Sequence, residues 1–158
     1  MNFEALQPHV AECLAANDFL APLTILQEFA PLLTAAELAQ NDARFEFAIA
    51  TQGVALVILS PIGRSRDTVK RSGLAMNVTV PIAICENPEV NRGPADPTAN
   101  PARRPFGHVA LRIQREVITA LLPYYNFPAT AGFDRPTIGV DGLLHYYLLP
   151  ERTVILVA

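Results

Sequence analysis

The sequence lacks several features, and each absence restricts the class of protein. It contains no tryptophan, only two cysteines among 158 residues, and only 17% charged residues. Cys13 and Cys85 are too few for a disulfide framework, so we expect stability to come from a hydrophobic core. The first four residues do not begin a signal peptide, and no apolar run reaches the roughly 20 residues of a membrane span. We therefore expect a cytoplasmic protein without a membrane partner.

The sequence also lacks the common catalytic motifs. None of its serines lies in a Gly-x-Ser-x-Gly turn, and its glycines form neither a phosphate-binding loop nor a dinucleotide-binding fingerprint. Glu86 and Glu89 fit solvated loop residues better than an acid–base pair. His9, His108 and His145 have no cysteine or acid at metal-ligand spacing. We expect no enzymatic activity, no metal and no cofactor.

Charge is distributed unevenly along the chain. Residues 1–50 contain seven acids and one base, a net charge of −6, whereas residues 51–158 contain eight acids and eleven bases, a net charge of +3. Two interpretations are open: the two regions contact each other between copies of the chain, or both are solvated surfaces. Hydrophobic residues make up 51% of the chain, which favours a surface partly covered by partner subunits.

Hydrophobic periodicity and turn residues predict the order helix, strand, helix, strand, strand, helix, strand, strand. The predicted helices span residues 3–16, 34–52 and 105–122, and the predicted strands span residues 20–28, 54–60, 74–85, 143–149 and 152–157. Long loops are expected at about 61–73 and 86–104. This order predicts a single α+β domain over residues 1–158, with a small mixed β-sheet and helices mainly on one face.

Local signals define several element ends. Thr34 and Glu37 form a capping box that starts the second helix, and Gly53 stops it. Pro22 predicts either an edge position for the first strand or a place where the pairing of that strand begins, because proline cannot donate a hydrogen bond to a ladder. Pro8 predicts either a kink in the first helix or a later start.

Residues 74–85 alternate between two kinds of side chain. The large apolar ones are Leu74, Met76, Val78, Val80, Ile82 and Ile84, and the small or polar ones are Ala75, Asn77, Thr79, Pro81, Ala83 and Cys85. A period of two places the two sets on opposite faces of a strand. We expect one long strand with an apolar face on the core and a smooth face toward solvent or a neighbour.

One basic cluster is present, at Arg64, Arg66, Lys70 and Arg71. It is either a contact surface for nucleic acid or an acidic protein, or the solvated tip of a hairpin. The pI of about 5.6 and the lack of aromatic residues between these bases argue against nucleic acid as the main partner.

A second cluster is aromatic. It consists of Tyr124, Tyr125, Phe127 and Phe133, close in sequence to Arg135. The cluster predicts either a pocket for a small ligand or a loop held against the core by its own aromatic side chains.

Several segments together resemble the tail terminator family of tailed bacteriophages. They are the capped helix that ends at Gly53 and passes directly to the strand from Val54, the strand end at residues 80–87 followed by Val90 and Asn91, the helix with Val109, Ile113, Val117 and Leu121, and the segment 142–147. The resemblance lies in element order across most of the chain, without a signature motif, and related neck and tail-completion proteins share this order.

The resemblance implies a structural α+β protein that forms a ring, commonly a hexamer, caps the tail tube and joins it to the head connector. Its expected partners are the tail tube protein and the head–tail connector protein, with no sequence-specific nucleic acid. Its expected location is the virion tail or neck, after assembly in the host cytoplasm. The alternatives are another neck or connector adaptor, or a small-ligand-binding module or enzyme.

The resemblance also assigns subunit contacts to the two long loops. The candidate contact residues are Arg64, Arg66, Lys70, Arg71, Glu86, Asn87, Glu89, Asn91 and Arg92. The small strand face at Ala75, Asn77, Thr79 and Ala83 would suit close subunit packing or the lumen of a ring. Pro81 would limit uncontrolled edge pairing.

Overall fold

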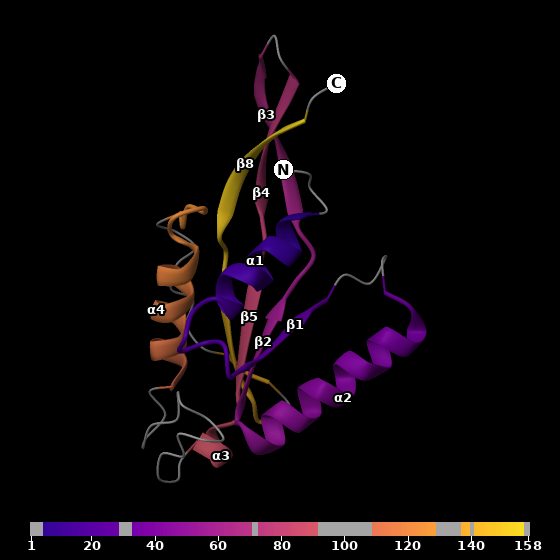
Figure 1. The fold of residues 1–158 in the computed structure, drawn as a ribbon, viewed down its shortest axis with the longest axis vertical. Helices are drawn as coiled ribbons and strands as arrows, with labels where there is room; N and C mark the ends of the chain where they lie inside the picture. The colour runs from indigo at the N-terminus through magenta and orange to yellow at the C-terminus, as the bar shows by residue number, and fades with distance from the viewer. Residues whose placement is uncertain are drawn as a thin grey trace.

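The computed structural model describes residues 5–28, 33–70, 73–91, 109–128, 137–139 and 141–156. The elements in chain order are α1 (Leu6–Ala15), β1 (Thr24–Gln27), α2 (Ala35–Thr51), β2 (Val54–Ile58), β3 (Ile62–Lys70), β4 (Gly73–Thr79), β5 (Ile82–Glu86), α3 (Pro88–Asn91), α4 (Val109–Leu121), β6 (Thr137–Ile138), β7 (Leu144–Leu148) and β8 (Glu151–Leu156). The chain is an α+β protein, as the sequence predicts (Figure 1).

Within the described residues the strands form two sheets. The main sheet has the order β1-β2-β5-β7-β6, and the second sheet has the order β3-β4-β8. The main sheet is mixed, because β1 runs parallel to β2 while the other neighbours are antiparallel. Strand β1 is at an edge of this sheet, and Pro22 precedes it, outside its ladder. Strand β2 lies between β1 and β5 and is buried along its whole length, as suits a continuous apolar run.

Three long strands pass from the main sheet into the second sheet, and each bends at a proline. Pro61 separates β2 from β3, Pro81 separates β4 from β5, and Pro150 separates β7 from β8. Each of these strands has the same neighbours before and after its bend: β2 pairs with β5 and β3 with β4, and likewise β5 pairs with β7 and β4 with β8. Backbone hydrogen bonds from Leu59 N to Pro81 O (2.8 Å) and from Val80 N to Pro150 O (3.0 Å) join the strands at this level. Because proline has no N–H, the regular ladder breaks here.

The bend corrects two strand predictions. The predicted strand 74–85 is two strands, β4 and β5, in different sheets. The predicted closing pair at 143–149 and 152–157 is not a hairpin, since β7 and β8 are consecutive halves of one bent strand.

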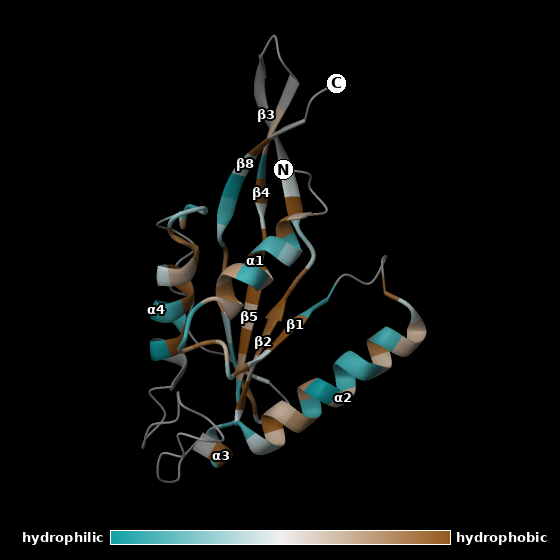
Figure 2. Ribbon diagram, viewed as in Figure 1, coloured by the Kyte–Doolittle hydropathy of each residue, from teal (hydrophilic) through white to brown (hydrophobic). Residues whose placement is uncertain are grey.

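The predicted alternation nevertheless persists through the bend. Val78, Val80, Ile82 and Ile84 are fully buried in the main core, beneath α1 and α4. The apolar stripes of the two helices meet them there, through Leu6, Val10 and Leu14 of α1 and Ile113, Val117 and Leu121 of α4. Figure 2 shows the corresponding apolar colouring along β2 and β5 and a mixture of hydrophilic and hydrophobic colours along α2.

The helix ends follow the local signals with one shift. The capping box is present, with Glu37 N donating to Thr34 Oγ1 (3.2 Å) and Thr34 N donating to Glu37 Oε2 (2.8 Å). The chain leaves α2 through Gly53, whose φ of +77° suits glycine. The described helix α1 begins at Leu6, which places Pro8 in the first turn, where it breaks no helical hydrogen bond.

The helices lie mainly on one face of the main sheet. α1 and α4 cover one face, whereas α2 lies over the β1–β2 edge of the opposite face (Figure 1). Buried Gln7 of α1 donates to the carbonyl oxygens of Ile58 (2.7 Å) and Glu28 (3.2 Å), which fixes α1 at the level where the strands bend. No helix in the described ranges is long and apolar enough to cross a lipid bilayer.

The second sheet projects away from the helices along the long axis of the molecule (Figure 1). We call β3 and β4 together the arm. The arm corrects the loop predicted at 61–73, because residues 62–70 form a strand paired with β4.

Candidate functional site

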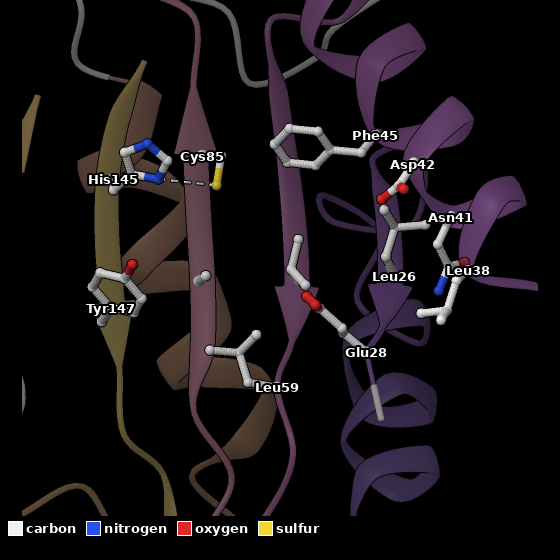
Figure 3. Close-up of a pocket in the computed structure, with 12 residues that line it drawn as sticks. Leu26, Glu28, Leu38, Asn41, Asp42, Phe45, Leu59, Cys85, His145 and Tyr147 are labelled. Atoms are coloured by element: carbon white, nitrogen blue, oxygen red, sulfur yellow. Dashed lines mark hydrogen bonds between the residues drawn. The ribbon is translucent and has the colours of Figure 1, made fainter. Parts of the chain in front are cut away.

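A groove of about 330 Å³ lies between α2 and the face of the main sheet that α1 and α4 do not cover (Figure 3). Strands β1, β2, β5 and β7 form its floor, where Leu26, Val57 and Ala83 make an apolar cluster. Leu38 and Phe45 of α2 form one wall. Side chains from five elements therefore converge on one concave surface.

The groove exists because α2 packs closely on the sheet only at its C-terminal end. There Ala48 and Ile49 are buried against Ala55, Cys85 and Leu143. Toward the N-terminal end of α2, Phe45 and Leu38 are only partly buried, and the helix diverges from the sheet (Figure 1). The helix therefore closes one end of the sheet face and leaves the other end open.

Small floor residues give the groove its depth. Ala83 is 7% exposed and Cys85 is 5% exposed, and both belong to the small face predicted for residues 74–85. Asn77 and Thr79 of that face are partly buried, and Asn77 Oδ1 accepts a hydrogen bond from Thr153 Oγ1 (3.0 Å). The small face is therefore divided between the groove floor and the second sheet, and it does not form one smooth outer surface.

The rim of the groove is acidic. Glu28 and Asp42 are exposed at its edge, and none of the described residues that line it is lysine or arginine. Asn41, between them on the rim, donates from Nδ2 to the Gln27 carbonyl (3.0 Å), which ties α2 to the edge strand β1. An apolar floor with a negative rim favours a partner that offers apolar side chains and positive charge.

Cys85 and His145 of the floor form a chain of polar groups with Asp141, an exposed residue in the turn before β7. Cys85 and His145 are register partners on β5 and β7, and Sγ lies 3.4 Å from Nδ1. Nε2 of the same ring lies 3.7 Å from Asp141 Oδ1. The carboxylate favours a proton on Nε2, which leaves Nδ1 to accept from the thiol. The order matches that of a nucleophile, a base and an orienting carboxylate.

The protonation of the thiol decides what this chain of groups does. Burial and the nearby Asp141 carboxylate raise the pKa of Cys85 to about 11. The thiol therefore keeps its proton at neutral pH and is a poor nucleophile, because the thiolate is the reactive form. The arrangement supports a hydrogen bond that joins β5 to β7 within the groove floor.

Gly139 makes room for this pair. A Cβ at Gly139 would lie 2.6 Å from Asp141 Oδ1 and 3.0 Å from His145 Nε2, closer than side-chain atoms normally approach. Sequence analysis missed the cluster because Cys85 and His145 are 60 residues apart and only the strand register joins them. The local signals were the spacing of Asp141 and His145 and the glycine just before them.

The predicted contact residues of the first loop lie on the arm. Arg64, Arg66 and Lys70 belong to β3, where Arg64 is the register partner of Asn77. Arg71 lies outside the described residues. The basic cluster is thus carried by an edge strand of the second sheet.

The predicted contact residues of the second loop lie at the opposite end of the molecule, near α3 (Figure 1). Glu86 ends β5 and is fully buried, which corrects its assignment as a contact residue. Asn87 donates from Nδ2 to the Ile49 carbonyl (3.3 Å) and accepts from Glu89 N (3.1 Å), so it links β5, α2 and α3. Glu89 is exposed on α3, Asn91 ends that helix, and Arg92 lies outside the described residues.

The aromatic cluster near Tyr125 packs as part of the core. Tyr125 is buried in the main core, and its hydroxyl lies 2.8 Å from His9 Nδ1 on α1. Burial raises the pKa of Tyr125 to about 12, so the phenol stays protonated. Tyr124 is exposed and contacts the His9 ring edge-on at 5.1 Å, whereas Phe133 and Arg135 lie outside the described residues. This supports the interpretation of a segment held against the core.

The histidines of the described ranges contact nearby polar side chains. His9 contacts Tyr125 and Cys13, His145 contacts Cys85 and Asp141, and His108 lies outside the described residues. No group of three His, Cys, Asp or Glu in those ranges could hold a metal ion. No family model, curated protein or solved structure matches the chain.

Proposed function

We propose that the protein is a structural subunit that assembles with copies of itself into a ring, and that it acts as a tail terminator of a tailed bacteriophage. In that role it would cap the tail tube and join it to the head connector. The mechanism is surface complementarity, without bond chemistry. The observation that carries the proposal is the arm, a pair of strands that extends beyond the helices and has β3 at its edge.

An edge strand is an assembly element because its backbone groups point outward in a row. In the described part of the second sheet, β3 has β4 on one side and no strand on the other. Such an edge pairs with or packs against another chain unless it is covered. Ile62, at the base of the strand, is 55% exposed, which adds apolar surface beside the edge.

The charges on the two ends of the molecule support contact between unlike surfaces. α2 carries Glu37, Asp42 and Glu46 with one base, Arg44, whereas β3 carries Arg64, Arg66 and Lys70 with one acid, Asp67. Contact between two different surfaces of the same chain is heterologous, and it produces a closed ring when the rotation between neighbours closes. A self-matching contact would give a dimer instead.

Further exposed apolar residues support contacts with other proteins. Phe47 on α2 and Leu122 and Tyr124 after α4 are exposed, and they lie on different sides of the main sheet. These side chains are accessible to apolar surfaces of other proteins. A tail tube and a head connector would need two such surfaces, one on each side of the ring. The same surfaces would serve another neck adaptor, which would differ in the partner it binds.

Imaging tests the proposal. The purified full chain is examined by mass photometry and negative-stain electron microscopy, alone and with purified tail tubes. We expect rings, and one ring at one end of each tube. A particle that stays monomeric at every concentration and leaves the tubes bare would contradict the proposal.

A further inference from the structure

The groove is open within its own chain. Tyr147 on β7 is 38% exposed beside it, and Leu59 and Phe45 are only partly buried. Apolar groups in this position gain about 25 cal/mol for each Å² that a partner removes from water. The groove face of the main sheet can therefore bind a partner through its apolar floor, and its acidic rim favours a positively charged partner.

The arm has the chemistry that this groove selects. β3 places Arg64, Arg66 and Lys70 along one strand, and apolar Ile62 and Val69 lie between and beside them in sequence. Net charge on β3 is +2, from three bases and one acid, against −2 on α2, from three acids and one base. Glu28 adds a further negative charge at the rim.

The arm does not reach the groove of its own chain. Figure 1 shows the arm at one end of the long axis and α2 at the other. β2 lies beneath α2, and the chain then runs through Pro61 directly away from it into β3. The complementary surfaces therefore meet only between two copies.

We infer that the groove between α2 and the main sheet receives the arm of a second copy of this chain. The inference rests on the proposed ring assembly and names the contact that closes it. The exposed apolar Ile62 of the incoming arm covers the floor at Val57 and Ala83, and the net positive charge of its strand β3 meets the negative charge of the rim. The groove, with a volume of about 330 Å³, admits a few side chains of an extended strand.

Two charge-reversal variants test the contact. The groove variant carries Glu28→Lys and Asp42→Lys, and the arm variant carries Arg64→Glu and Arg66→Glu. Each variant alone sets like charges against each other, and we expect self-association about tenfold weaker or worse by mass photometry. An equimolar mixture restores opposite charges at every contact, because each reversed groove meets a reversed arm and each native groove meets a native arm. We therefore expect the mixture to assemble.

Control variants place single charge reversals of the same kinds on the other face. Glu12 on α1 and Arg115 on α4 are exposed and lie away from the groove. Glu12→Lys and Arg115→Glu should assemble like the native chain. Recovery of assembly in the mixture also shows that both test variants are folded.

A photo-crosslinking amino acid at Tyr147 identifies the occupant. In a mixture of isotopically heavy and light protein, we expect mixed-isotope crosslinks to peptides that contain residues 62–79. Crosslinks to another part of the chain, or to added tube protein alone, would overturn the inference. If both charge-reversal variants form rings as readily as the native chain, the inference about the groove is overturned, while ring assembly itself stands. Rings that respond as expected but ignore tail tubes would overturn the proposed phage role and leave the groove contact standing.

Discussion

The two faces of the main sheet use the same strands and are packed to very different degrees. On the face toward α1 and α4, Leu56, Ile58 and Ile84 are fully buried in one continuous core. On the face toward α2, the side chains are smaller, the buried residues fall into two small clusters, and a groove remains. The first face stabilises the fold, and the second is available for a partner.

The closed face should show the largest effect on stability. Ile84→Ala removes a fully buried side chain and leaves a cavity, so we expect a loss of about 2–5 kcal/mol in the free energy of unfolding. Urea denaturation followed by circular dichroism measures it. A loss below about 1 kcal/mol would contradict the account of the core.

The Cys85 thiol gives the open face a distinct response to pH. Its pKa is raised in the folded protein to about 11 from an ordinary value of 9.0, so the folded state holds the proton more tightly. That stabilisation is complete below pH 9 and is lost as the pH rises toward 11, by roughly 2–3 kcal/mol. Urea denaturation across this range should show the loss in the native chain.

The control for this titration is Cys85→Ala. The variant keeps Tyr125 and Tyr146, which also titrate at high pH, and it should lose less stability over the same range. Identical pH profiles for the native chain and Cys85→Ala would show that the thiol is not responsible.

The wall of the groove depends on the start of α2. Thr34→Ala removes the oxygen that accepts from Glu37 N, and we expect a loss of about 1 kcal/mol with fraying of the first turn. Hydrogen exchange should rise at residues 35–38 and remain unchanged at Ala48 and Ile49, which pack on the sheet. Faster exchange along the whole of α2 would contradict the division of the helix into a packed and an open end.

The sequence predicts those features of the fold that depend on residues close to one another in the chain. Thr34 with Glu37 sets the start of α2, and Gly53 sets its end, because caps act within a few residues. The alternation through residues 74–85 predicts both faces of β4 and β5, because period two survives the bend. Pro81 alone did not predict the bend of the strands. The bend occurs where Pro61, Pro81 and Pro150 lie at the same level of neighbouring strands, and this alignment is known only from the strand register.

The candidate site could not be predicted in the same way. The groove depends on the angle at which α2 leaves the sheet, and Cys85 meets His145 only through pairing between distant strands. The sequence places Glu86 in a loop because Asn87 and Pro88 follow it, whereas in the structure Glu86 is the last residue of β5. The bases of β3 are close together in the sequence, but their place on an extended strand was not predicted.

The most direct test of the central claim is a substitution that fills the groove without disturbing the core. Ala83→Leu adds bulk to the floor, and we expect the free energy of unfolding to change by less than about 1 kcal/mol. Ala43→Leu, at an exposed position on α2, is the matched control. Circular dichroism should find Ala83→Leu folded, and mass photometry should find no rings of it under conditions in which the native chain and Ala43→Leu form rings. Rings of Ala83→Leu as stable as those of the native chain would contradict the claim that the open face is the assembly surface.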